Sequence, residues 1–173
     1  MVGAASAETA EQLVELYPSA LPQVFGFLAS RCSSAAVAED LTAETFMAAV
    51  SAITTGTVDT ITVGWLIVVA RRRLVDYWRQ QEREQRHLRL IDQPIDETSD
   101  PWDDEYDVAA TRAALERLGP HHQAVLTLRY LDGLPVREVA KYLARGVPAT
   151  EALLHRARLA LRRAYIEGGI DGD

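Results

Sequence analysis

The chain has little of what secreted, redox-active or membrane-spanning proteins depend on. Cys32 is the only cysteine in 173 residues, which excludes an intramolecular disulfide and fits a reducing compartment. The N-terminal stretch has no basic segment followed by an apolar one, so no signal peptide is predicted. The longest apolar run, Val63 to Ala70, is too short to span a bilayer. We therefore predict a cytoplasmic protein without membrane insertion.

Features of β-structure are also scarce. The alternation of apolar and polar residues that marks a strand is almost absent. Leu, Ala, Arg and Glu dominate instead, and the apolar content of 48% is ordinary for a globular chain. The sequence predicts an all-α protein.

The net charge of −7 is concentrated in one segment. Eight acidic residues and no Lys or Arg lie between Asp92 and Asp107. Without these eight, 17 acidic residues remain against 18 basic ones, so the rest of the chain is close to neutral. This segment, which also holds Pro94 and Pro101, is typical of an extended, self-repelling linker.

Two small helical domains joined by an acidic flexible linker are therefore predicted, with limits 8–91, 92–107 and 108–166. In the first domain, Pro18 and Pro22 are expected to break the helical run of 8–31 into two helices. Further helices are expected at 38–52 and 63–90. The inward stripe of the 38–52 helix is predicted from its spacing as Phe46, Ala49, Val50 and Ile53.

The second domain contains two amphipathic helical patterns separated by a breaker. Helices are expected at 109–118 and 121–131, with Val125, Leu128 and Leu131 facing inward. After these two helices, residues 144–148 act as a helix breaker between two shorter amphipathic helical patterns within 134–163. The chain is expected to end in a flexible tail from Ile166.

Residues 134–163 have the pattern of a helix-turn-helix, whose second helix lies in the DNA major groove. That second helix carries cationic and hydrogen-bonding side chains suited to phosphates and base edges: His155, Arg156, Arg158, Arg162 and Arg163. The alternative is an ordinary helical hairpin with a solvated basic face.

The 63–90 helix interleaves aromatic residues with arginines. Trp65 and Trp78 lie among Arg71, Arg72, Arg73, Arg79 and Arg83. Bases stack on aromatic rings and guanidinium groups bind phosphates, so the pattern is compatible with single-stranded DNA binding. Aromatics in the core and arginines that keep the exposed face soluble would explain it equally well.

The sequence offers no recognisable catalytic or metal site. Asp40 and Glu44 are one helical turn apart, but no His or Cys lies near them, so a charged binding surface or a solvated face is favoured over acid–base chemistry. His121 and His122 point about 100° apart on a helix and cannot easily chelate one ion. No cofactor fingerprint is present, and Cys32 is expected to be a small buried side chain. An enzyme is not predicted.

Segments on both sides of the linker resemble one family. AEDLTAETF (38–46) and WLIVVARRRLVDYWR (65–79) resemble the second conserved region of bacterial sigma factors. The stretch that begins LGPHHQAVL at Leu118 and runs to Arg163 resembles the fourth region. Their order, and the absence of a third region between them, is similar to the extracytoplasmic-function type.

The resemblance implies a promoter-specificity subunit of RNA polymerase, with three contact surfaces. Core polymerase would be bound by Asp40, Leu41, Glu44 and Phe46. The −10 element would be captured and melted by the 54–62 loop and by Trp65, Arg71, Arg72, Arg73, Tyr77, Trp78 and Arg79. The −35 duplex would be read by Arg129, Arg137, Ala149, Thr150, Glu151, His155, Arg156 and Arg158.

The resemblance also implies an anti-sigma partner that covers these surfaces, and it implies no catalytic residue. The chain departs from the family at Glu151 and Leu153, where Lys or Arg is frequent, and the 54–62 loop is poor in basic and aromatic residues. Promoter preference is therefore left open. The alternative function is a stand-alone helix-turn-helix regulator that uses residues 108–165 without polymerase.

Overall fold

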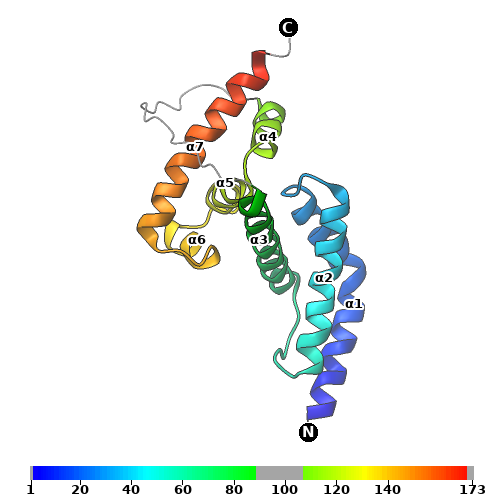
Figure 1. The fold of residues 1–173 in the computed structure, drawn as a ribbon. Helices are drawn as coiled ribbons and strands as arrows, with labels where there is room; N and C mark the ends of the chain where they lie inside the picture. Colours follow the sequence, from blue (N-terminus) through cyan, green and yellow to red (C-terminus); the bar gives the residue numbers. More distant parts are fainter. Residues whose placement is uncertain (1, 89–106, 171–173) are drawn as a thin grey trace. The chain divides into compact units, whose positions relative to one another are not determined.

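The computed structural model describes residues 2–88 and 107–170, and every regular element among them is helical (Figure 1). The all-α prediction is confirmed. The predicted linker lies outside the described residues apart from Asp107. The chain divides into two compact units, Met1–Asp76 and Tyr77–Asp173, so the division falls inside α3 (Val63–Leu88). The predicted domain limits, 8–91 and 108–166, stay a prediction.

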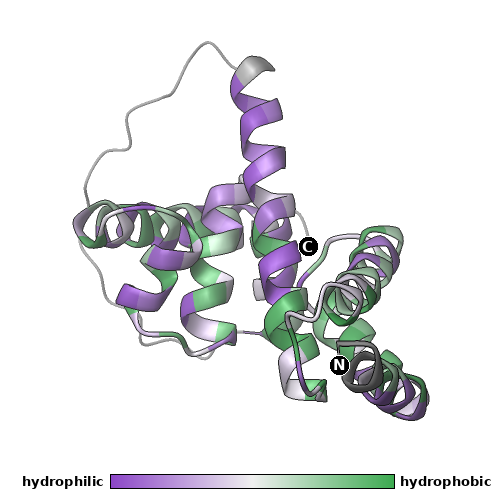
Figure 2. Ribbon diagram, turned by 90° about the horizontal axis from the view of Figure 1, so that it is seen from below, coloured by the Kyte–Doolittle hydropathy of each residue, from purple (hydrophilic) through white to green (hydrophobic). Residues whose placement is uncertain are grey.

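In the first unit, α1 (Val2–Ala29) and α2 (Ala35–Thr54) pack side by side (Figure 1). Small and branched apolar side chains form the buried core of this unit: Leu13, Ala20, Val24, Leu28, Ala38, Leu41, Ala49, Ile53, Leu66, Ala70 and Leu74. Hydrophilic and hydrophobic residues alternate along the helices at helical spacing (Figure 2). The apolar stripe of each helix is therefore the side that packs against the neighbouring helices.

The prediction that Pro18 and Pro22 break the first helix is wrong. Both prolines lie inside the continuous helix α1. They are four residues apart and exposed, so they share the solvent side, where the carbonyl groups they leave without an N–H partner can be hydrated. On the opposite side Ala20 and Val24 are fully buried. Packing of that side outweighs the local cost of the two prolines.

The loop between α2 and α3 is anchored at both ends. Thr55 donates a hydroxyl hydrogen bond to the Ser51 carbonyl at 2.8 Å, which extends the end of α2. Ile61 is buried, and the Thr62 hydroxyl accepts the Trp65 backbone N–H at 3.1 Å, as an N-cap does. The loop expected at 54–62 therefore begins after Thr54, and its two ends are fixed by these hydrogen bonds and by the buried Ile61.

In the second unit, the described elements other than α3 are arranged around α7 (Val147–Ile170). The segments α4 (Val108–Glu116), α5 (Pro120–Leu126) and α6 (Val136–Tyr142) all contact α7. The helix α7 continues to Ile170, so the prediction of a flexible tail from Ile166 is wrong for Ile166–Ile170. Leu161 and Ala164 are buried, so the packed stripe of α7 extends beyond its middle turns.

A π-helical turn, η1 (Thr127–Leu131), follows α5 directly. The Asp132 N–H donates to the Thr127 carbonyl at 3.0 Å, five residues back instead of four. The wider turn changes the direction of the side chains that follow, so Leu128 is fully buried while Leu131 is 50% exposed. The prediction that Leu131 faces inward is therefore wrong.

Two glycines give opposite expectations for the same substitution. Gly133 has φ +66°, a left-handed backbone that a Cβ disfavours, so Gly133→Ala is expected to lower the free energy of unfolding by about 1 kcal/mol. Gly26 lies inside α1 with open space around its Cα, so Gly26→Ala is expected to raise that free energy by about 0.5–1 kcal/mol. Urea denaturation of both variants checks this, and equal signs would contradict it.

Candidate nucleic-acid interface

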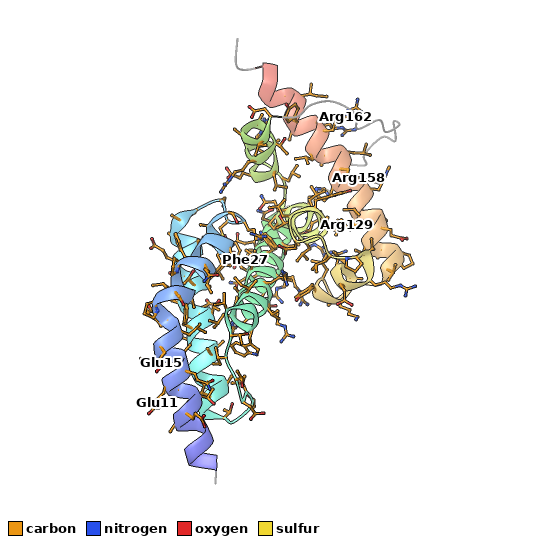
Figure 3. The ribbon with its side chains drawn as sticks, turned by 180° about the vertical axis from the view of Figure 1, so that it is seen from behind. Glu11, Glu15, Phe27, Arg129, Arg158 and Arg162 are labelled. Atoms are coloured by element: carbon orange, nitrogen blue, oxygen red, sulfur yellow. The ribbon has the colours of Figure 1, made fainter. Side chains whose placement is uncertain are left out.

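The first turns of α7 present a continuous exposed face. Helical spacing places Ala149, Ala152 and Arg156 on one stripe and Glu151, His155 and Arg158 on the adjacent one. All of these side chains are exposed except Arg158, which is half-buried. Arg158 and Arg162 lie one turn apart further along α7 (Figure 3). The face offers small residues for close approach to a groove, with donors beside them.

Thr150 does not belong to this face, which corrects the prediction. Its side chain is 0% exposed, and its hydroxyl donates to the Gly146 carbonyl at 2.9 Å, so it ties the first turn of α7 together. Leu153 is likewise buried in the core of the unit. The apolar residue at 153 is therefore a packing residue, and only Glu151 among the two departures changes the exposed face.

The helix before the turn, α6, contributes exposed Arg137, and the preceding segment contributes Arg129. Arg129 donates through Nη1 to the Leu134 carbonyl at 3.2 Å, and its guanidinium lies 5.9 Å from the ring centre of Tyr130. Arg129 thus supports the loop that leads into α6. A −35 contact by its remaining donors stays a prediction.

The turn between α6 and α7 is closed by an alanine in a left-handed conformation. Ala144 has φ +51°, whereas the positive-φ glycines of the described chain are Gly56 and Gly133 and do not include Gly146. The Arg145 N–H donates to the Ala140 carbonyl at 3.0 Å and the Ala144 N–H to the Lys141 carbonyl at 3.1 Å. These two bonds satisfy carbonyls at the end of α6 and hold Ala144 in its left-handed conformation.

On α3, the predicted −10 residues separate into exposed and packed ones. Trp65, Arg72 and Arg79 are spaced seven residues apart, so they lie on one side of the helix. Arg72 and Arg79 are exposed and Trp65 is half-buried. Arg73 and Tyr77 are half-buried. The exposed arginines remain candidates for contacts with DNA phosphates.

Trp78 is only 3% exposed, so a stacking contact between Trp78 and a DNA base is withdrawn. Arg71 has a structural contact as well, because its guanidinium lies 5.6 Å from the ring centre of Phe27, which Arg31 covers at 3.9 Å. Phe27, labelled in Figure 3, was not singled out from the sequence. Phe27 is half-buried between Arg31 and Arg71, and nothing in the sequence around Phe27 indicates that Arg71 of α3 lies beside it.

On α2, Asp40, Glu44 and Met47 form an exposed stripe at helical spacing. Met47 is 69% exposed, and Val50, predicted to face inward, is exposed as well. Leu41 is only 4% exposed, so its predicted contact with polymerase is withdrawn. Phe46 is half-buried and stacks edge-on against Tyr17 of α1, with ring centres 4.9 Å apart. Met47 was not predicted as a contact residue from the sequence, although it lies about one turn from Glu44.

The thiol of Cys32 is buried, as predicted from the sequence. Cys32 is buried, and burial raises its pKa to about 11 against the opposing effect of the neighbouring Arg31 guanidinium. The thiol therefore stays protonated at neutral pH and is a poor nucleophile.

The described residues contain neither a cluster of metal ligands nor a membrane-spanning helix. Within 2–88 and 107–170, no three or more His, Cys, Asp or Glu side chains gather as they would around a metal ion. No helix in the described part of the chain is both long and apolar enough to cross a membrane.

Comparison with known families gives two matches. The model of sigma-70 region 2 matches residues 16–84, and the model of sigma-70 region 4 matches residues 109–161. Together they match well over half of the chain. The chain belongs to the sigma-70 family. The exposed stripes of α2 and α3 lie in region 2, and the turn and first turns of α7 lie in region 4.

Individual relatives carry the same family name. The chain is 32% identical to "ECF RNA polymerase sigma factor BldN" of Streptomyces coelicolor, over 94% of this chain and 64% of that protein. It therefore spans less than two thirds of this relative's length. A solved structure of an RsbN–BldN complex is 30% identical, covers 94% of this chain and 98% of that one, and has a TM-score of 0.36. The resemblance to the extracytoplasmic-function type is confirmed.

A second solved structure shares the fold. It contains the sigma factor RpoE with the anti-sigma factor NepR from Bartonella quintana. It is 21% identical, covers 87% of this chain and 93% of that one, and has a TM-score of 0.52.

Proposed function

We propose that this protein is a promoter-specificity subunit that binds core RNA polymerase in the cytoplasm and directs initiation at promoters with −10 and −35 elements. The match to regions 2 and 4 in this order carries the proposal. The protein itself contributes no catalytic group, because polymerase carries out the chemistry.

Reading of the −35 element is assigned to the exposed face of α7. Ala149 and Ala152 leave room for close approach to a major groove, and His155 and Arg156 are exposed beside them. Glu151 is exposed on the same turn, where a carboxylate repels phosphate but can accept a hydrogen bond from cytosine N4. This combination favours a duplex in which a cytosine faces the first turn of α7.

Capture of the −10 element is assigned to the exposed side of α3 and the held loop before it. Arg72 and Arg79 supply cations for the backbone of a melted strand, and Trp65 supplies an aromatic surface at the start of the helix. Because Ile61 and Thr62 anchor the loop, its exposed residues form a defined surface beside Trp65. An unstacked base needs such a preformed surface.

Docking on core polymerase is assigned to the exposed stripe of α2, Asp40, Glu44 and Met47, with Phe46 at its edge. We further propose that an anti-sigma factor controls the protein by covering these surfaces. The structure of RpoE of Bartonella quintana with the anti-sigma factor NepR supports this for a protein of the same fold.

Arg156→Ala is expected to weaken binding to a −35 duplex by about 1–3 kcal/mol if the guanidinium contacts a base edge. Titration of labelled duplexes at two salt concentrations measures this. Loss of discrimination between sequences indicates a base contact, whereas a uniform loss with a smaller salt dependence indicates a phosphate contact.

Arg112→Ala is the matched control for this measurement. Arg112 lies on α4, and its guanidinium pairs with Glu116 at 3.5 Å, so the same loss of charge occurs away from the α7 face. Equal effects of the two substitutions would show that only overall charge matters and would contradict the assigned face.

The proposed function as a whole is tested with purified protein and bacterial core polymerase. Co-purification, followed by run-off transcription from the upstream region of its own gene, is the expected result. Duplex binding without any association with core polymerase would instead identify a stand-alone regulator.

A further inference from the structure

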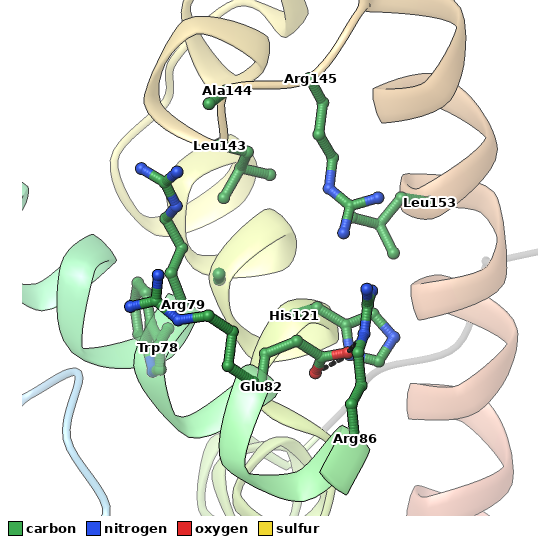
Figure 4. Close-up of a pocket in the computed structure, with 11 residues that line it drawn as sticks. Trp78, Arg79, Glu82, Arg86, His121, Leu143, Ala144, Arg145 and Leu153 are labelled. Atoms are coloured by element: carbon green, nitrogen blue, oxygen red, sulfur yellow. Dashed lines mark hydrogen bonds and ion pairs between the residues drawn. The ribbon is translucent and has the colours of Figure 1, made fainter. Parts of the chain in front are cut away.

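A pocket lined by more basic than acidic side chains lies wholly within the second unit. Its volume is about 400 Å³, within the range that holds small ligands. Its walls come from the last turns of α3, from α5, from the turn before α7 and from α7 itself (Figure 4). Leu143, Leu153 and Trp78, which line it, are buried, so this apolar part of its lining is packed.

Four arginines line this pocket: Arg79, Arg83, Arg86 and Arg145. They come from two separate parts of the chain, and Figure 4 shows Arg86 and Arg145 pointing toward one another across the pocket. Like charges repel, so such convergence is stabilised when an anion occupies the space between them.

Glu82 is the only carboxylate among the described residues that line the pocket, and it is already engaged. Its Oε1 accepts from Arg86 Nε at 2.9 Å, and its Oε2 lies 2.6 Å from His121 Nδ1. Burial raises the pKa of Glu82, but the contacts with His121 and Arg86 outweigh it and bring the pKa below its ordinary value. The ionised carboxylate can only accept, so His121 Nδ1 donates the proton. One engaged carboxylate leaves the pocket with an excess of positive charge.

We propose that this pocket binds a small anion with two or more phosphate groups, either an inorganic polyphosphate or a nucleoside polyphosphate. Guanidinium groups that approach from α3 and from the α6–α7 turn can each engage a different phosphate. A pocket of this size suits a compact ligand better than a duplex, whose phosphates are spread along an extended backbone. Bound anion would join the last turns of α3 to the turn of the helix-turn-helix inside this unit.

The first test is calorimetric titration of the full-length protein with sodium tripolyphosphate at an ionic strength of about 0.15 M. Saturable binding of one tripolyphosphate per chain is expected. The double variant Arg83→Ala, Arg145→Ala is expected to lose at least about tenfold in affinity for each arginine removed, because each charge-assisted bond to phosphate is lost. The control Arg112→Ala, Arg163→Ala removes the same charge outside the pocket and should keep the affinity within about twofold.

Glu82→Gln provides an independent test, in which the affinity for tripolyphosphate is expected to rise instead of fall. It removes the negative charge of Glu82 and releases Arg86, so the affinity for tripolyphosphate should rise by about threefold or more. Unchanged or weaker binding by a folded Glu82→Gln protein would contradict the proposal, even if the double arginine variant failed to fold.

Further arms distinguish the source of the ligand and its competitors. Tighter binding of ATP or GTP than of tripolyphosphate assigns a nucleoside polyphosphate, and equal binding assigns an inorganic one. Tighter binding of a short DNA duplex through Arg83 and Arg145 would make the pocket part of the promoter surface and would overturn the proposal. The proposal would also be overturned if tripolyphosphate bound only after the eight acidic residues of 92–107 were replaced by Asn and Gln. In that case the chain's own acidic segment would be the occupant of the pocket.

Discussion

Leu128→Ala is expected to destabilise the second unit by about 2–5 kcal/mol, the range found when a fully buried leucine is truncated. Leu128 is 0% exposed and lies in η1, between α5 and α6, both of which pack on α7. The cavity left by three missing carbon atoms therefore lies beneath the helix-turn-helix. Urea denaturation followed by circular dichroism measures the loss, and binding to a −35 duplex should fall in parallel.

Leu131→Ala is the matched control, with the same truncation three residues later. Because the π-helical turn places Leu131 at the surface, the expected cost is below about 1 kcal/mol. Similar losses for the two variants would mean that Leu131 packs inward as in an uninterrupted α-helix, and the π-helical register would be wrong.

Met47→Glu is expected to weaken the association with core polymerase by about 2 kcal/mol or more, roughly thirtyfold. Met47 is an exposed apolar side chain on the same stripe of α2 as Asp40 and Glu44. If polymerase covers this stripe, a buried carboxylate without a partner would oppose docking. Competition for core polymerase against the unmodified protein measures the change.

Ile166→Glu makes the same chemical change on α7, where Ile166 is also exposed. It should leave the competition unchanged, and both variants should keep the stability of the unmodified protein because neither side chain is buried. Normal competition by Met47→Glu would move the docking surface away from this stripe. Duplex binding by the second unit should be unaffected in either case.

The helices and their order followed from local patterns in the sequence. Apolar residues three and four apart predicted helices at 38–52 and 63–90, and the structure has them at Ala35–Thr54 and Val63–Leu88. The helix-turn-helix was predicted from two short amphipathic patterns around residues 144–148, and α6 and α7 flank a turn there. Such predictions succeed because helical periodicity is set by hydrogen bonds between near neighbours.

Which side of each helix is covered depended on residues distant in the sequence. Leu41, Trp78 and Thr150 each lie beside exposed candidates, and only packing against other helices identifies them as buried. The same holds for the pair of Arg71 and Phe27, which are 44 positions apart in the sequence. A periodic pattern shows which residues share a face but not which neighbour covers that face.

The continuity of α1 and the register after Thr127 were likewise decided by the tertiary structure. Local propensity favours a break at Pro18 and Pro22 and a uniform helix up to Leu131, and the structure has neither. By itself the sequence determined a helical protein of two sigma-like regions with an acidic segment between them. The tertiary structure decided which side chains remain at the surface, and that four arginines meet around one pocket, because burial and convergence are sums over contacts between distant parts of the chain.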